Sequence, residues 1–385
     1  MSLLPSLGLV FLSGLFLGEL VQKLKLPPLL GYLLAGILLG QGDILSETLT
    51  EISPDLREIA LLMILLKAGL TLSWNRVKAV GKSGFFLAFC PASFEILSCL
   101  ILAPVLFDIS YLEAALLGSV LSAVSPAVVV PRMVGLIEKG CKSKAPETVL
   151  AGASLDDVFV ILLFTSLLSL STGEGFSLAM LLTLPLSIIF SMVLGGILGK
   201  LLSDWTYFSQ LSGEKAVLFL LGLSFLFLGM EEVLPLSALL AVLVLGLCLE
   251  KKDYVKVLSQ KFTSLWEGAQ LLLFVLVGAE VSVEHALDTG LLGILLLGIG
   301  LIVRSFGVYL STMGGNLSKK ERRFIAISYL PKATVQAGIG GIPLALGLDC
   351  GELVLSLAVL AILITAPLGA ILMDQYSEKL LEVSP

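Results

Sequence analysis

The sequence has little charge for its length. Charged side chains make up 14 % of its 385 residues and hydrophobic side chains 57 %, against about 25 % and about 45–50 % in soluble globular chains. So few charges cannot cover the surface of a soluble protein of this size. The composition therefore excludes a soluble fold and predicts an all-α protein that crosses a membrane many times.

The residues that usually bind metals are also scarce. The chain has one histidine and five scattered cysteines, with no pair at the spacing of a zinc or redox motif. We therefore expect no cofactor and no resident metal. A formal charge of −6 and the lack of a basic tract argue against a nucleic-acid partner.

Long apolar runs, in contrast, fill the chain. A helix needs about 20 mostly apolar residues to cross a bilayer, and runs of this kind, separated by glycines, prolines and charge clusters, predict about thirteen transmembrane helices, here called spans 1 to 13. Spans 2, 8 and 9 are short. The spans lie near residues 3–22, 26–41, 56–73, 83–106, 110–132, 146–170, 176–202, 214–230, 235–250, 264–281, 288–311, 322–345 and 352–373.

Basic residues collect on one side of these spans. If the N-terminus is outside, 20 of the 24 Lys and Arg residues fall in inner loops and only Arg57 lies at an outer mouth. Lysine and arginine are enriched in cytoplasmic loops. The pattern predicts a multi-pass protein of the cell (inner) membrane, in contact with lipid, with the N-terminus outside and the C-terminus cytoplasmic.

Spans 5 and 12 carry helix-breaking residues near their middle. Proline removes a backbone donor, so both spans should be interrupted inside the membrane unless they are merely kinked. They are seven spans apart and therefore run in opposite directions, which predicts two inverted repeats, spans 1–6 and 8–13, joined by span 7. Paired broken helices of this kind are typical of secondary transporters. The residues concerned are Pro126 and Pro131 in span 5, and Pro331, Thr334 and Gly338 in span 12.

Ionisable side chains inside the spans are costly and usually functional. Asp156 and Asp157 lie about ten residues into span 6, and Lys332 lies about ten residues into span 12, which places all three roughly 15 Å deep, at the bilayer midplane. Carboxylates beside unwound backbone suit a monovalent cation or a proton. We predict that Asp157 is the primary carrier of Na+ or H+, with Asp156 as a helper ligand or as the partner of Lys332. Ser125 and Ser154 are candidate further oxygen ligands.

Three other ionisable residues lie within spans. Glu95 in span 4 and Arg304 in span 11 occupy corresponding positions of the two repeats, which favours a buried salt bridge between them, although a direct part in ion handling stays open. Lys67 in span 3 either pairs with a carboxylate or extends to the inner face, and the sequence does not decide its role.

At these residues a family resemblance emerges. The chain resembles the monovalent cation:proton antiporter superfamily and, within it, the NHA-type sodium/proton antiporters, as a bacterial homologue of the animal branch. The motifs are KAGL at 67–70, CP at 90–91 followed by Glu95, SPAVVVP at 125–131, ASLDD at 153–157 and LPKATVQA at 330–337. Where the family pattern leads us to expect arginine, this chain has Lys67.

The resemblance implies an NhaA-like fold and a homodimer in which a mobile core moves as an elevator. On this basis the dimerisation domain comprises helices 1–3 and 8–10, the core comprises helices 4–6 and 11–13, and helix 7 links the two. The corresponding ranges are 1–82 and 213–284 for dimerisation, 83–172 and 285–374 for the core, 173–212 for the linker and 375–385 for a cytoplasmic tail.

The sequence therefore predicts a transporter, not an enzyme, that exchanges Na+ (or Li+) for H+. A K+/H+ antiporter or a cation-coupled solute symporter on the same fold stays open as the alternative. An intramembrane aspartyl protease is disfavoured because its two aspartates would lie on separate helices, whereas Asp156 and Asp157 are adjacent on one.

Overall fold

The computed structural model describes residues 2–24, 26–42, 44–71, 81–171, 178–231, 233–234, 236–249, 253–281, 283–315 and 317–381. Within these ranges all regular structure is helical and no strand is present. Eight of the helices in the described part are long and apolar enough to cross a membrane, and two shorter apolar helices accompany them. The all-helical membrane fold predicted from composition is confirmed.

Each predicted span overlaps one helix or an interrupted helix, although the bounds differ. Spans 1 to 3 are α1 (Leu3–Lys23), α2 (Leu29–Gln41) and α4 (Ser53–Thr71), and span 4 is α6 (Gly81–Leu87) with α7 (Cys90–Phe107). Span 5 is α8 (Tyr111–Ser122) with α9 (Pro126–Glu138), and spans 6 to 8 are α10 (Ala145–Ser171), α11 (Leu178–Asp204) and α13 (Gly213–Glu231). Spans 9 to 11 are α14 (Ala238–Cys248), α15 (Asp253–Ala279) and α16 (Val283–Thr312). Span 12 is α17 (Lys319–Ser328), α18 (Thr334–Ile339) and α19 (Ile342–Ala345), and span 13 is α20 (Gly351–Leu380). Two short helices, α3 (Glu47–Glu51) and α12 (Thr206–Gln210), lie in connections.

Spans 5 and 12 are both interrupted in the middle. Helix α8 stops at Ser122 and α9 restarts at Pro126, while α17 stops at Ser328 and α18 restarts at Thr334. Pro126 stands at the first position of α9, where a missing backbone N–H costs nothing. The breaks leave three and five residues in extended or irregular backbone, and two of these residues, Ser125 and Lys332, belong to the candidate site.

The helix-breaking residues do not all act as the sequence suggests. Pro131 lies inside α9 and Gly338 inside α18, so neither marks an interruption. Conversely, span 4, predicted as one continuous helix, contains a turn at Ala88–Phe89 between α6 and α7. Pro91 near the start of α7 explains this turn, because proline has no N–H to bond to the preceding helical turn.

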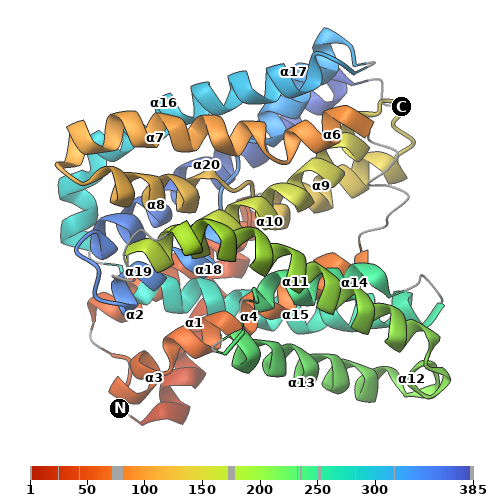
Figure 1. The fold of residues 1–385 in the computed structure, drawn as a ribbon. Coiled ribbons are helices and arrows are strands. Elements are labelled where there is room, and N and C mark those ends of the chain that lie inside the picture. Colours follow the sequence, from red (N-terminus) through yellow and green to blue (C-terminus); the bar gives the residue numbers. More distant parts are fainter. Residues whose placement is uncertain are drawn as a thin grey trace. The chain divides into compact units, whose positions relative to one another are not determined.

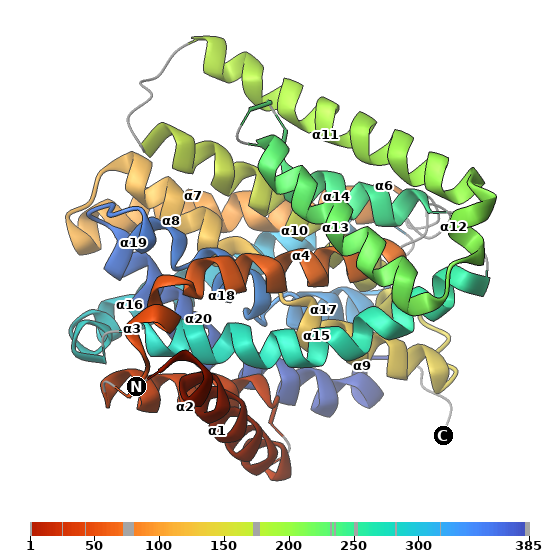
Figure 2. The same ribbon diagram turned by 90° about the horizontal axis from the view of Figure 1, so that it is seen from below.

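The chain divides into two compact units. Unit 1 comprises Met1–Pro54, Val77–Thr172 and Leu271–Pro385, and unit 2 comprises Asp55–Arg76 and Gly173–Gln270. Within unit 1, α7 packs along α16 (Figure 1) and α1 packs along α2 (Figure 2). Within unit 2, α11 packs against α14, and the core around α13 and α14 includes the fully buried Leu220, Phe227 and Val242. Both predicted breaks belong to unit 1.

A glycine allows α20 to approach the break of span 12. A Cβ atom added at Gly369 would lie 2.7 Å from Cδ of Pro331 and closer still to its Cγ. A larger residue would therefore push Pro331, and the extended backbone that follows it, away from α20. Because Gly369 has no side chain, the segment that carries Lys332 lies close against α20.

Candidate functional site

The two interrupted helices meet at their breaks. The backbone N–H of Ser125, in the break of span 5, donates to the carbonyl of Pro331, in the break of span 12, at 2.8 Å. The segments are thus joined by a backbone hydrogen bond although about two hundred residues separate them along the chain. Both Ser125 and Lys332 are fully buried there.

Arg304, on α16, is the centre of the charged groups around this crossing. Its Nη1 lies 3.0 Å from Oε2 of Glu95 on α7, and its Nη2 lies 3.0 Å from Oδ2 of Asp156 on α10. Arg304 and Asp156 are 0 % exposed and Glu95 is 1 % exposed. The guanidinium therefore joins two carboxylates that the sequence placed in separate groups.

Arg304 also satisfies the ends of both broken helices. The last carbonyls of a helix lack partners within it and carry partial negative charge. Nη1 of Arg304 donates to the carbonyl of Ser122, the last residue of α8, and its Nε donates at 2.9 Å to the carbonyl of Tyr329, just beyond α17. One buried cation thus compensates two half-helix ends, and its fork of donors suits this task.

Lys332 pairs with Glu95. Its Nζ lies 2.5 Å from Oε2 of Glu95, the same oxygen that Arg304 contacts. The sequence offered Asp156 as a partner for this lysine, but in the structure Asp156 is paired with Arg304. The backbone N–H of Lys332 donates to Oγ1 of Thr365 on α20 at 2.8 Å, which fixes the extended segment that carries the ammonium.

The charges of this network balance, and Asp157 lies outside it. Two cations, Arg304 and Lys332, face two carboxylates, Glu95 and Asp156, so the four groups sum to zero when all are ionised. Asp157 is 7 % exposed, and no ion pair joins it to a residue that the structure describes. An ionised Asp157 would therefore add one uncompensated negative charge at the crossing.

Several oxygen atoms around the breaks also lack hydrogen-bond partners among the described residues. Buried polar atoms are normally paired, so such a group calls for a ligand, an ion or water. Carboxylate, hydroxyl and amide oxygens are the donors that hard cations prefer. The unpaired atoms are Oγ of Ser125, Oδ1 of Asp156, Oδ1 of Asp157, Oγ1 of Thr334 and Oε1 of Gln336.

The sequence also singles out Ser154 and Lys67. The side chain of Ser154, proposed as an extra ligand, lies outside the described residues. Lys67 is half-buried on α4 and belongs to unit 2, whereas the crossing belongs to unit 1. No role was predicted from the sequence for Gln336 or Thr365. The one feature that points to them is that each is an uncharged polar residue within a transmembrane run.

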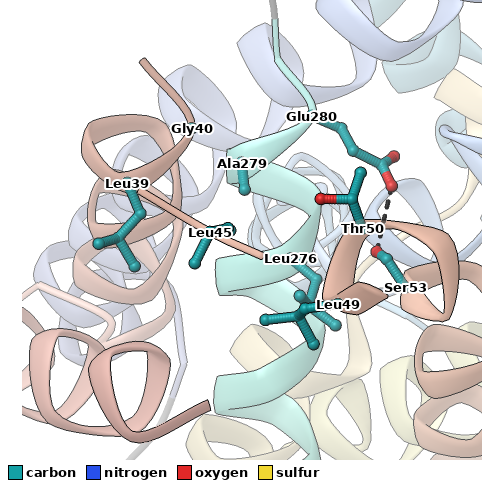
Figure 3. Close-up of a pocket in the computed structure, with 9 residues that line it drawn as sticks. All are labelled: Leu39, Gly40, Leu45, Leu49, Thr50, Ser53, Leu276, Ala279 and Glu280. Atoms are coloured by element: carbon teal, nitrogen blue, oxygen red, sulfur yellow. Dashed lines mark hydrogen bonds between the residues drawn. The ribbon is translucent and has the colours of Figure 1, made fainter. Parts of the chain in front are cut away.

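A separate cavity of about 170 Å³ lies within unit 1, between α2, α3 and the C-terminal end of α15 (Figure 3). Leucine side chains, including Leu39, Leu49 and Leu276, form its apolar walls. On its polar side Ser53 donates to Glu280 at 3.1 Å. None of the residues that the sequence selects for ion binding lines this cavity, so the candidate ion site is the crossing of the broken helices.

Known proteins resemble this chain over most of its length. Residues 8–374 match the family model described as "Sodium/hydrogen exchanger, transmembrane". The chain is 35 % identical to sodium/hydrogen exchanger 9B1 of Homo sapiens, over 97 % of this chain and 78 % of that protein, and 32 % identical to human sodium/hydrogen exchanger 9B2, over 97 % and 74 %. The structure superposes on the sodium proton antiporter MjNhaP1 from Methanocaldococcus jannaschii with a TM-score of 0.84, at 21 % identity, over 99 % of both chains.

Proposed function

The chain belongs to the sodium/hydrogen exchanger family, and from this premise we propose that it exchanges Na+ (or Li+) for H+, the two ions competing for Asp157 with Asp156 as helper ligand. The observation that carries the proposal is the charge balance at the crossing. Arg304, Lys332, Glu95 and Asp156 neutralise one another, and Asp157 is left over.

A buried carboxylate without a partner is unstable as an anion. Moving it out of water costs several kcal/mol on any scale, and the group escapes this cost by binding a proton or a cation. Asp157 therefore has two stable states at the crossing, protonated or cation-bound. A carboxylate that has bound a proton binds a cation only weakly, and the reverse also holds. Each ion therefore displaces the other, and this competition is the basis of exchange.

The neighbouring oxygens favour a partly dehydrated monovalent cation. Oδ1 of Asp156 and the hydroxyls of Ser125 and Thr334 have no protein partner among the described residues and come from three different segments that meet at the breaks. Together with Asp157 they supply neutral and anionic oxygen ligands without adding a second uncompensated charge. A divalent cation would leave one positive charge unbalanced, so the balance favours Na+, Li+ or K+.

Transport in proteoliposomes tests this proposal. Purified protein is reconstituted with a preset inside-acid pH gradient, and Na+, Li+ or K+ is added alone while internal pH is followed. We expect Na+ and Li+ to dissipate the gradient and Asp157→Asn to abolish the response, because asparagine neither ionises nor carries a proton. Asp349→Asn, an exposed position in the connection before α20, is the matched control.

The same assay separates the alternatives. Dissipation by K+ alone would indicate a K+/H+ antiporter on this fold, and dissipation that requires an added organic solute would indicate a symporter. Retention of full exchange by Asp157→Asn would reject Asp157 as the carrier.

The family resemblance also supports proposals on assembly, movement and location. We propose a homodimer, an elevator-type movement of the core, and a location in the cell membrane with the N-terminus outside. The many apolar helices and the family membership support a multi-pass membrane transporter. The ions are its substrates, and the proposed exchange requires no cofactor.

A further inference from the structure

Gln336 is a fully buried, uncharged side chain that links the two broken helices. It lies on α18, immediately after the break of span 12. Its amide nitrogen donates to the carbonyl of Val120 at 3.1 Å and to the carbonyl of Ala123 at 2.9 Å. These carbonyls belong to the end of α8 and to the break that follows it, so a side chain of one interrupted helix holds the backbone of the other.

The peptide group between Ala123 and Val124 is held on both edges. Its carbonyl accepts from Gln336, and its N–H, on Val124, donates to Oδ2 of Asp156 at 2.9 Å. In a trans peptide the carbonyl and the N–H lie in one plane and point in opposite directions. Gln336 and Asp156 therefore bind opposite edges of one rigid plane, and a rotation of that plane changes both contacts.

This arrangement selects which oxygen of Asp156 faces the ion. Oδ2 accepts two hydrogen bonds, one from the N–H of Val124 and one from Nη2 of Arg304 at 3.0 Å. Oδ1 has no partner among the described residues. If the peptide plane turned, Oδ2 would lose its backbone donor, and the contact with Nη2 of Arg304 alone would hold the carboxylate in its orientation.

We propose that Gln336 is a positioning residue of the ion site. By fixing the Ala123–Val124 peptide, it keeps Oδ2 of Asp156 occupied and presents Oδ1 to the cation. Gln336 acts through the peptide and not as a proton carrier. The inference rests on the proposed cation/proton exchange at Asp156 and Asp157, and it adds a residue outside the charged network.

A role in helix capping alone predicts a different result. The end of a helix leaves carbonyls unpaired, and a side chain that only satisfied them would add stability without affecting ion affinity. Gln336→Met separates capping from a role at the ion site, because methionine has nearly the same length and volume but neither the amide donor nor the amide oxygen. A capping role lowers the melting temperature and leaves the half-saturating Na+ concentration unchanged.

The experiment measures Na+-driven exchange in proteoliposomes, together with the melting temperature of the purified protein. We expect Gln336→Met to raise KM for Na+ about tenfold, the scale of one lost hydrogen bond in a charged network, while the maximal rate changes less than about twofold. Ile339→Val, a packing change on the same helix α18, is the control that should leave KM unchanged.

The outcomes are distinct. An unchanged KM in Gln336→Met, with normal exchange by the wild type, overturns the positioning role and leaves the proposed function standing. A wild type that exchanges no monovalent cation overturns both. If Gln336→Met does not reach the membrane, KM for Na+ is measured on Gln336→Asn instead. Its amide is one methylene too short to reach the carbonyl of Ala123, so the same rise in KM is expected.

Discussion

The ammonium of Lys332 lies 2.5 Å from a carboxylate oxygen of Glu95, a residue 237 positions earlier in the chain. This contact ties the break of span 12 to α7. Asp156 is paired with Arg304 instead, so Lys332 and Asp156 belong to one network without a direct contact between them.

The first prediction concerns the charge balance between Lys332 and Glu95. Lys332→Met leaves the network with one excess negative charge, and Glu95→Gln leaves it with one excess positive charge. Each should lower the free energy of unfolding in detergent by about 3 kcal/mol, because a buried charge loses its partner. The double variant restores neutrality and should be more stable than either single variant. Additive losses would show that the two residues are not coupled.

The second prediction concerns stoichiometry. If exchange takes place at Asp157 as proposed, outside the neutral network, one monovalent cation replaces one proton and we expect no net charge to move. Clamping the membrane potential with K+ and valinomycin should leave the initial rate of Na+-driven exchange unchanged. A rate that varies severalfold with the imposed potential would mean that a second group, with Lys332 the first candidate, changes its charge during transport.

The third prediction concerns Arg304. Its donors reach two carboxylates and two backbone carbonyls in one planar fork, which a single ammonium does not reproduce. Arg304→Lys, although it keeps the charge, should reduce exchange to less than about a tenth of the wild-type rate. Arg323→Lys, at an exposed position of α17, is the matched change and should be silent. Wild-type exchange by Arg304→Lys would show that charge alone matters here.

The fourth prediction concerns the contact between Gly369 and Pro331. Gly369→Ala places a methyl group against the proline ring and should lower the free energy of unfolding by about 1–3 kcal/mol, the usual cost of overpacking. Gly222→Ala on α13 has open space around the new methyl group and should stabilise the helix by up to about 1 kcal/mol. Melting temperatures of the two variants should therefore shift in opposite directions.

The fifth prediction concerns pH and a contact outside the membrane-spanning segments. Burial alone would raise the pKa of Glu321, but hydrogen bonds from Ser143, Ser318 and the backbone of Lys144 outweigh it and hold the pKa below its ordinary value of 4.5. A lowered folded pKa stabilises the protein above pH 4.5, and this contribution is lost as the pH falls through the folded value.

Ser143→Ala should therefore be less stable than the wild type at pH 7, and the difference should shrink below about pH 4.5. Glu378→Gln, at an exposed position of α20, is the control for a general effect of acid. A Ser143→Ala difference that persists unchanged into acid would show that the hydrogen bond to Glu321 is not its cause.

Much of the fold follows from the sequence. Apolar runs predicted the helices because a chain in lipid must satisfy its backbone internally, and Pro126 and Pro331 mark the two interruptions because proline removes a donor. The turn before α7 was missed, although Pro91 signals it, because the apolar run continues through it.

The partners within the site could be predicted only in part. Counting residues along a helix predicted that Asp156 and Lys332 lie at similar depth, and in the structure both belong to one network of ion pairs. Depth does not give the direction in which a side chain leaves its helix, and this direction decides that Lys332 meets Glu95 while Arg304 meets Asp156. The role of Gln336 was not predicted, because its partners are backbone carbonyls of another helix and the sequence does not show which helix that is.

The backbone hydrogen bond between Ser125 and Pro331 restricts how an ion bound at this crossing would reach either side of the bilayer. The two irregular segments are hydrogen-bonded to each other at the proposed ion site, so we expect them to move together and not apart. On the proposed mechanism, a cation bound there would therefore move together with both segments, as an elevator-type movement of the core requires.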